Sequence, residues 1–196
     1  VIVPSFTVDR LAYHDNFEAA APTVVRPESS RSLVRYGPTM LLGYTVSLDT
    51  LVYVGGDYNW RNYDRDVGPT RDSHGYAIYG GVRFRPSRLT RLDVALGWQR
   101  QDYRLPYRTP DGLYFNASAD WSVTPLTLVS FDLTRDISES GSLLSGGIVR
   151  TRANLGVRHE LLRTLRLEAD VSLRNYRIED LARSVRRANL GLGANY

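Results

Sequence analysis

The stretch Val34–Leu48, VRYGPTMLLGYTVSL, decides how the rest of the chain is interpreted. Its even positions are apolar, aromatic or Pro, and most of its odd positions are small or polar. Side chains on a β-strand alternate between the two faces of a sheet, so this stretch predicts a strand with one apolar and one polar face. The strand would be much longer than a soluble strand, which has about five or six residues. A strand that crosses a bilayer at a tilt needs roughly 9–11 residues, so this one is long enough to span a membrane.

The same alternation recurs along the chain and predicts ten strands. Their approximate ranges are 1–14, 34–48, 52–61, 76–85, 91–99, 113–123, 129–134, 149–158, 165–174 and 187–196. In the first strand the alternation places Arg10 on the apolar face. A β-bulge near Asp9–Arg10 would restore the phase, because a bulge adds one residue to a strand.

The predicted connections alternate between long and short. Long loops are expected near 15–32, 62–72, 102–112, 136–147 and 177–186, and short turns near 48–51, 85–90, 124–127 and 160–164. Outer-membrane barrels have long extracellular loops and short periplasmic turns. A soluble barrel or sandwich would also alternate, but strand length favours the membrane barrel. The sequence therefore predicts an all-β, antiparallel, up-and-down transmembrane β-barrel. It forms a single domain over residues 1–196, either complete or part of a larger barrel.

Composition excludes several other classes of protein. The 196 residues contain no Cys, which rules out disulfides and thiolate metal sites, and no apolar run is long enough for a transmembrane helix. The net charge is +4 and every one of the 25 basic residues is Arg. These arginines are scattered among 21 acids, without a basic helix, zinc-ligand spacing or an aromatic RNA-binding motif, so nucleic acid is not expected as a partner.

The polar face of the strands carries charges of both signs and is the predicted lumen lining. Its members are Arg35, Asp57, Arg61, Arg83, Arg91, Asp93, Asp120, Asp132, Arg150, Arg152, Arg158, Arg166, Glu168, Asp170 and Arg174. Neighbouring strands would bring together Arg83, Arg91 and Asp93, and likewise Arg158, Arg166, Glu168 and Asp170. Buried charges must be paired or hydrated. Two interpretations stay open: a salt-bridged plug in a narrow barrel, or an Arg-lined pore that favours anions.

The apolar face carries the residues predicted to contact lipid. Its aromatic members are Tyr36, Tyr44, Trp60, Tyr76, Phe84, Trp98, Trp121 and Phe131. They gather near the two ends of the strands, as in the aromatic girdles at the two membrane interfaces. The alternative explanation is the general preference of strands for aromatic residues.

Catalysis is not expected. The three His residues are His14, His74 and His159. Ser73 and His74 are adjacent, so on a strand their side chains point to opposite faces. His159 lies at a short turn with no Ser nearby. The sequence therefore predicts no enzyme activity, no metal site and no cofactor.

The repeated hairpins GVRFRPSRLTRLDVALGWQRQDY and GVRHELLRTLRLEADVSLRNYRI resemble the β-barrel porin families of Gram-negative bacteria. The most similar group is associated with exopolysaccharide and capsule export, and its members are longer than this chain. The resemblance implies a location in the Gram-negative outer membrane, with extracellular long loops and both termini in the periplasm. Outer-membrane lipids, lipopolysaccharide and other envelope proteins are the implied partners. Two functions follow: a porin-like channel or polysaccharide-export component with an Arg-rich lumen, or a plugged structural barrel that docks a partner.

Overall fold

The computed structural model describes residues 1–12, 32–64, 70–140, 145–178 and 180–196, which form one antiparallel sheet of ten strands. The strands are β1 (Ile2–Leu11), β2 (Leu33–Ser47), β3 (Thr50–Tyr63), β4 (Ser73–Ser87), β5 (Thr90–Tyr103), β6 (Asp111–Thr124), β7 (Thr127–Glu139), β8 (Gly147–Leu162), β9 (Leu165–Ile178) and β10 (Arg183–Asn195). Each strand pairs with its neighbours in sequence, so the predicted up-and-down order of ten strands is confirmed. No helix in the described ranges is long and apolar enough to cross a membrane.

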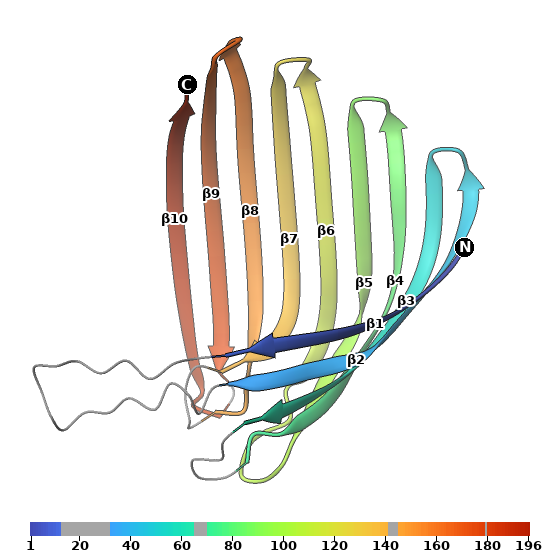
Figure 1. Ribbon diagram of the computed structural model, residues 1–196, viewed down its shortest axis with the longest axis vertical. Helices are drawn as coiled ribbons and strands as arrows, with labels where there is room; N and C mark the ends of the chain where they lie inside the picture. The colour runs from blue at the N-terminus through green and yellow to red at the C-terminus, as the bar shows by residue number, and fades with distance from the viewer. Residues whose placement is uncertain (13–31, 65–69, 141–144, 179) are drawn as a thin grey trace, which may run out of the picture.

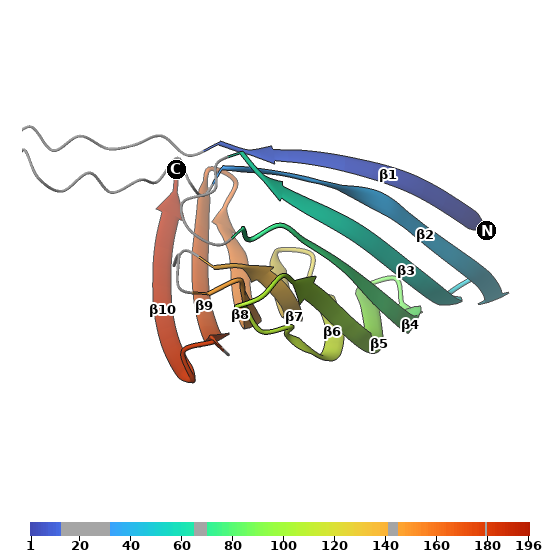
Figure 2. The same ribbon diagram turned by 90° about the horizontal axis from the view of Figure 1, so that it is seen from below.

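The sheet coils into a deep trough (Figures 1 and 2). The four short turns lie along one end of the trough, and the longer connections lie along the other, here called the loop end (Figure 1). Among the described residues β1 pairs only with β2, and β10 only with β9, so the sheet has two open edges. The C-terminus lies at the turn end, and the Val1 ammonium donates to the Gly43 carbonyl oxygen (2.7 Å), near the same end.

Each of the four short turns has two residues between the paired strands. The residues between the paired strands are Leu48-Asp49, Arg88-Leu89, Pro125-Leu126 and Arg163-Thr164. In the first three turns, the last residue of the incoming strand is Ser or Thr, and its hydroxyl accepts a hydrogen bond from the amide two residues later, at 3.2–3.3 Å. Such Ser/Thr bonds favour tight turns. The predicted short turns are confirmed at these positions.

Two glycines permit the strong coiling of β2 to β5. A Cβ atom added at Gly37 would lie 1.8 Å from the Tyr58 carbonyl oxygen, and one at Gly97 would lie 2.0 Å from the Ile78 carbonyl oxygen. In both cases the obstacle is the backbone of the neighbouring strand, which a rotamer change cannot move. Glycine at such points lets a sheet bend sharply.

Three sequence-based expectations are wrong. β1 runs from Ile2 to Leu11 in continuous register with β2, so there is no bulge near Asp9–Arg10. Arg10 lies at the loop end of the strand, 3.6 Å from Asp64 and largely exposed, so no shift of phase is needed. The long loop expected over 177–186 is also wrong, because β9 continues to Ile178 and β10 begins at Arg183. Finally, the strands extend to Tyr103 and Glu139, so the loops near 102–112 and 136–147 are shorter than predicted.

Two other predicted loops lie wholly or partly outside the described residues. The loop at 15–32, except Ser32, and residues 65–69 of the 62–72 loop belong to this part of the chain, as does His14.

Candidate functional site: the concave face of the sheet

The strand register puts every predicted lumen residue on one face of the sheet. The cross-strand partners are Arg35 and Arg61, Arg83 and Asp93, Arg91 and Asp120, and Arg158 and Glu168. The other members lie on the same face because side chains alternate along each strand. This face is concave, because side chains reach across it between strands that are not neighbours. The Tyr53 hydroxyl on β3 donates to Asp93 on β5 at 2.5 Å, passing over β4. All fifteen predicted residues therefore share the concave face.

Most charged groups on this face are paired. Arg35 contacts Asp9 (2.7 Å), Arg83 contacts Asp93 (2.8 Å), Arg150 contacts Asp136 (2.5 Å), Arg158 contacts Glu168 (3.0 Å) and Arg166 contacts Glu160 (3.6 Å). The two predicted clusters therefore form only in part, because Arg166 contacts Glu160 instead of Glu168, and Arg91 lies opposite Asp120. Sequence reasoning missed the roles of Asp9, Asp136 and Glu160.

Between β3 and β6 the concave wall is built of tyrosines laid over glycines. The Tyr53 ring covers Gly81, and the Tyr79 ring covers Gly55, each so closely that a Cβ atom on the glycine would lie 2.4 Å from a ring carbon. Tyr79 and Tyr114 stack with ring centroids 5.0 Å apart. Pairing the two predicted strands in register would have indicated this wall, because each glycine lies directly opposite a tyrosine of the neighbouring strand.

Near the loop end, the hairpin of β7 and β8 leaves β6 and folds across the concave side of β3 to β5. The register of β6 with β7 stops at Phe115 and Arg135. Beyond that point the Gln99 carboxamide replaces the missing strand partner. It accepts from the Ile137 amide (3.1 Å) and donates to the Arg135 carbonyl oxygen (3.3 Å). As a result Ile137 and Val149 are buried, although their alternation would place them on the convex face.

Arg61 anchors this hairpin from the opposite wall. Its side chain is 3% exposed and donates to the Tyr103 hydroxyl (3.2 Å) and to the Ile137 carbonyl oxygen (3.0 Å). It also lies 3.4 Å from the Glu139 carboxylate. A buried guanidinium needs several acceptors, and these groups supply them. β3 and β7 are thus joined directly across the trough.

Asp180 ties three loop-end connections together. One carboxylate oxygen accepts from the Arg108 amide (2.7 Å), and the other accepts from the Ser145 hydroxyl (3.0 Å) and the Gly146 amide (3.1 Å). Ser145 is fully buried. Most of the buried residues in the described part of the chain lie at the loop end, around Asp180 and the inward-folded hairpin. The sequence assigned no role to Asp180 or Gln99, and none to the Glu139–Arg61 pair, because the contacts described here join residues that are 34 or more positions apart.

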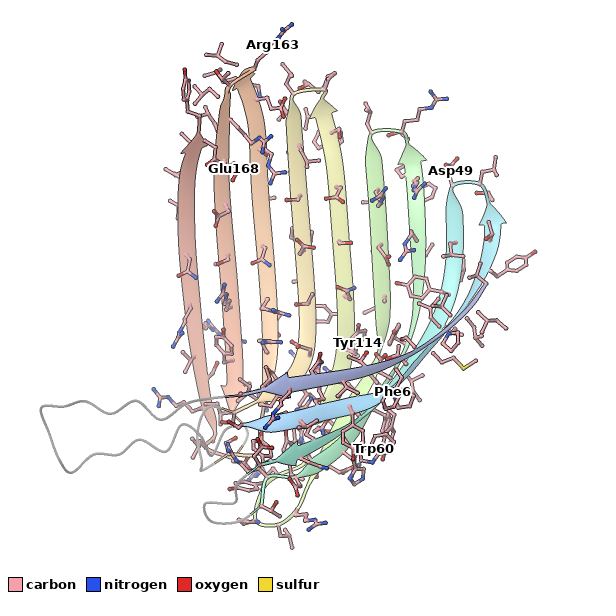
Figure 3. All side chains as sticks on the ribbon, in the orientation of Figure 1. Phe6, Asp49, Trp60, Tyr114, Arg163 and Glu168 are labelled. Atoms are coloured by element: carbon pink, nitrogen blue, oxygen red, sulfur yellow. The ribbon has the colours of Figure 1, made fainter. Side chains whose placement is uncertain are left out.

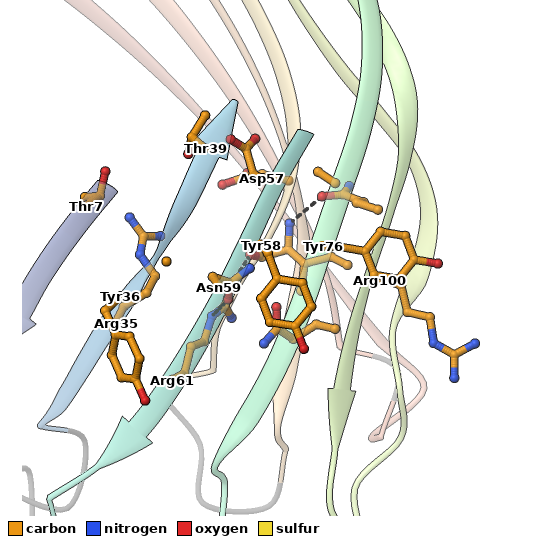
Figure 4. Close-up of a pocket in the computed structure, with 16 residues that line it drawn as sticks. Thr7, Arg35, Tyr36, Thr39, Asp57, Tyr58, Asn59, Arg61, Tyr76 and Arg100 are labelled. Carbon is orange, nitrogen blue, oxygen red and sulfur yellow. Dashed lines mark hydrogen bonds between the residues drawn. The ribbon is translucent and has the colours of Figure 1, made fainter. Parts of the chain in front are cut away.

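A pocket of about 270 Å³ remains between this hairpin and strands β1 to β5 (Figure 4). Its lining combines cationic, anionic and neutral polar groups, including Arg35, Arg61, Asp57, Asn59 and Asp136. The pocket therefore offers both charge signs and has no single-sign character.

On the concave face of β8 to β10, three arginines lie side by side without an acidic partner among the described residues. Arg152, Arg174 and Arg187 lie directly opposite one another in the register of these three strands. We call these three residues the arginine row. Arg152 donates to the Thr134 hydroxyl (3.3 Å), and the Arg187 guanidinium lies 5.9 Å from the Tyr176 ring centroid. No carboxylate in the described part of the chain lies within salt-bridge distance of any of the three.

The convex face carries the aromatic residues predicted to contact lipid, all eight of which lie on it by register (Figure 3 labels Trp60). Near the loop end, Tyr36 stacks on Trp60 (5.4 Å between ring centroids), and Tyr58 meets Trp60 edge-on (4.6 Å). Large apolar side chains elsewhere on this face are exposed, for example Leu190 at 72% and Leu192 at 80%. An apolar surface of this extent needs a nonpolar environment.

The described residues hold no group of three or more His, Asp or Glu side chains that could bind a metal ion. Ser73 and His74 face opposite sides of β4, as predicted: Ser73 accepts from Gln101 (2.9 Å) on the concave side, and the His74 ring lies against Tyr58 on the convex side. His159 contacts the Thr127 hydroxyl (2.8 Å). Neither His is paired with a nucleophile and an acid.

The comparison with protein families agrees with this architecture. The family described as "Putative beta-barrel porin 2" matches residues 4–196. The chain belongs to this porin family. It is therefore a porin-like β-barrel protein of the outer membrane, and membership of this family favours a channel or structural role over an enzymatic one. Comparison with curated proteins gave no match.

Two solved structures share the fold. OmpT, an outer membrane protein of Vibrio cholerae folded in vitro, superposes with a TM-score of 0.54 at 14% sequence identity, covering 87% of this chain and 66% of OmpT. Its trimer form gives a TM-score of 0.53 at 15% identity, covering 98% of this chain and 64% of OmpT. This chain thus spans about two thirds of the length of these barrels, and the likeness concerns the fold.

Proposed function

We propose that the concave face lines a channel through the outer membrane that favours anionic solutes. The observation that carries the proposal is the arginine row, Arg152, Arg174 and Arg187, whose positive charges have no neighbouring carboxylate among the described residues. The other predicted lumen arginines on β2, β3 and β4, by contrast, each contact a carboxylate. A cluster of like charges on a low-dielectric wall raises the local concentration of counter-ions.

The arginine row also carries an energetic argument for function. Directly opposed like charges on neighbouring strands destabilise a sheet by roughly 0.2–1 kcal/mol per pair. Three aligned arginines add two such pairs, and no acid of the described residues within salt-bridge distance offsets their repulsion. A passing anion would compensate this repulsion, because Arg presents a planar fork of donors to carboxylate, phosphate or sulfate groups.

The inward-folded hairpin sets the size of the proposed passage. It narrows the loop end and leaves the wall of β8 to β10 open toward the turn end. The solutes that suit this geometry are small anions or an extended acidic chain. An acidic surface polysaccharide in the course of export is one member of the second class. We place the loop end outside the cell and the short turns in the periplasm, in line with the usual asymmetry of such barrels.

A second candidate function rests on the packing of the loop end. The buried contacts of Arg61, Gln99 and Asp180 favour a barrel closed at that end, which would serve as an anchor or docking partner for other envelope proteins.

Planar-bilayer recording of the folded full chain separates the two candidates. A channel gives stable ion conductance, a reversal potential that indicates anion preference in a salt gradient, and a preference that weakens as ionic strength rises. Absence of conductance in repeated insertions, with folding verified by circular dichroism, would overturn the channel and favour the closed barrel.

A further inference from the structure

The four short turns form a rim at the turn end of the trough, and backbone hydrogen bonds fix most of it (Figure 1). In each of the first three turns, the carbonyl oxygen of the second turn residue accepts from an amide of the next hairpin, at 2.8 Å. The donor and acceptor pairs are Arg85 and Asp49, Ser122 and Leu89, and Glu160 and Leu126. The amide of the same turn residue donates to a Ser or Thr hydroxyl. Each turn is therefore held both by its own hairpin and by the next one.

Each short turn carries an exposed leucine at the turn or within two residues of it. Leu48 is fully exposed, and Leu89, Leu126 and Leu161 are each about half exposed. The exposed part of a side chain contributes no apolar burial to folding. A series of leucines along one rim therefore marks a surface suited to contact with a partner.

A groove of about 790 Å³ opens beside the first two turns. Its apolar lining includes Leu48, Leu89 and Leu128, and its volume lies within the range of roughly 300–1,000 Å³ that is typical of binding sites. Arg91 and Asp120, which also line it, lie directly opposite each other on the concave face. The groove therefore faces the interior of the trough, away from the surface that contacts lipid.

The charged groups of the groove lack partners in the described part of the chain. Arg85, Arg88 and Arg91 are exposed, and none lies within salt-bridge distance of a carboxylate there. Asp49 and Asp120, the two carboxylates of the lining, form no ion pair there either, so three guanidinium groups against two carboxylates give a net charge of +1. A simple anion offers only acceptors. An acidic peptide offers carboxylates to the arginines and backbone amides to the two aspartates.

We propose that this groove, defined by Leu48, Arg85, Arg88, Leu89 and Arg91, docks an acidic, leucine-bearing peptide segment of a periplasmic protein. Arg and carboxylate form charge-assisted, bidentate hydrogen bonds, which would hold the acidic side chains of the segment. Its apolar side chains would cover the two leucines and remove them from water. The periplasmic source of the partner rests on the proposed orientation of the short turns, whereas docking itself does not depend on anion passage.

The fourth turn provides matched control positions. Arg88 and Arg163 are each the first residue of a short turn, and both are exposed, but only Arg88 lines the groove (Figure 3 labels Arg163). Leu89 and Leu161 are both 53% exposed, and only Leu89 lines the groove.

The probe is a short fluorescein-labelled peptide of repeating Glu-Glu-Leu units. Fluorescence anisotropy with the full chain folded in detergent micelles measures its Kd. R88Q and L89S should each raise the Kd about tenfold, through the loss of one charge-assisted contact or one buried leucine. R163Q and L161S should leave the Kd unchanged. Circular dichroism verifies that all four variants fold.

Two further peptides identify what is recognised. A Lys-Lys-Leu peptide and a Glu-Glu-Ser peptide should each bind at least about tenfold more weakly than the Glu-Glu-Leu peptide. Equal Kd values for wild type, R88Q and L89S would overturn the proposal. Equal affinity for the Glu-Glu-Ser peptide would also overturn it and reassign the groove to a simple anion.

The same experiment tests two other occupants of the groove. Displacement of the peptide by phosphatidylglycerol bicelles would reassign the groove to lipid. Self-association of the wild type that is lost in L89S and retained in L161S would reassign it to a second copy of this chain. These measurements involve no ion flow, so failure of this proposal is distinguishable from failure of the channel.

Discussion

The two halves of the concave wall, β2 to β5 and β8 to β10, differ in how closely their side chains pack and in how their arginines are paired. On β2 to β5 the wall is closely packed: tyrosines cover glycines, Arg61 is 3% exposed, and Arg35, Arg61 and Arg83 each contact a carboxylate. On β8 to β10 the backbone register is equally regular, but Arg174 and Arg187 are exposed and have no acidic partner among the described residues. The side chains of the first half stabilise the fold, whereas the arginines of the second half are available to contact an anionic solute. Substitutions in the two halves should therefore differ in their effects on stability and selectivity.

The largest effect is expected where a glycine meets the backbone of a neighbouring strand. Gly97→Ala on β5 would place a Cβ atom 2.0 Å from the Ile78 carbonyl oxygen, and should lower the free energy of unfolding by about 3 kcal/mol or more. Gly193→Ala on β10 is the matched control, because its nearest atom is 3.9 Å away, and it should change stability by less than about 0.5 kcal/mol. Urea unfolding followed by tryptophan fluorescence compares the two. Similar midpoints for G97A and wild type would show that the coiling of β2 to β5 does not depend on this glycine.

An intermediate effect is expected at the buried ion pair. Arg61→Met removes the guanidinium that contacts the Glu139 carboxylate and the Ile137 carbonyl oxygen, and should cost about 2 kcal/mol of unfolding free energy after allowance for the partial exposure of Glu139. Arg158→Met on β8 breaks a pair whose side chains are 52% and 37% exposed, and should cost less than about 1 kcal/mol. The same urea titration measures both. A larger loss of unfolding free energy in R158M than in R61M would contradict the conclusion that the wall of β2 to β5 is the more important for stability.

The smallest effect has the opposite sign. Arg174→Gln removes the central charge of the arginine row and both of its like-charge contacts, so it should raise the unfolding free energy by roughly 0.2–1 kcal/mol at low ionic strength. The gain should shrink as salt is added, because salt screens exposed charges. A destabilised R174Q protein would mean that Arg174 has a structural partner.

The regular part of this architecture was accessible from sequence. Alternation between apolar and polar residues predicted ten strands, their order and the face of every candidate residue, because the period of two is set by strand geometry alone. Patterns such as the one in Val34–Leu48 depend only on residues close in sequence. The four short turns were predicted for the same reason, and in three of them Ser or Thr at the end of the incoming strand is a local signal for a tight turn.

What sequence reasoning missed depends on contacts between distant residues. Gln99 takes over the pairing of β7, and Asp180 joins three connections, yet neither residue stands out from its neighbours in the sequence. The inward fold of the β7–β8 hairpin likewise reverses the expected environment of Ile137 and Val149, because alternation assumes that a strand keeps the same neighbour along its length. The loop over 177–186 was overestimated because charged residues there occupy paired strand positions, such as Arg186 opposite Asn175.

Ion selectivity tests the central claim most directly. Two double variants remove the same charge from the same two strands: R174Q/R187Q on the concave side and R177Q/R186Q on the convex side. In planar bilayers with a salt gradient, the wild-type protein and R177Q/R186Q should give reversal potentials of equal anion preference. R174Q/R187Q should lose most of that preference. An unchanged reversal potential in R174Q/R187Q, or an equal shift in both variants, would contradict the assignment of the arginine row as the anion-selective wall.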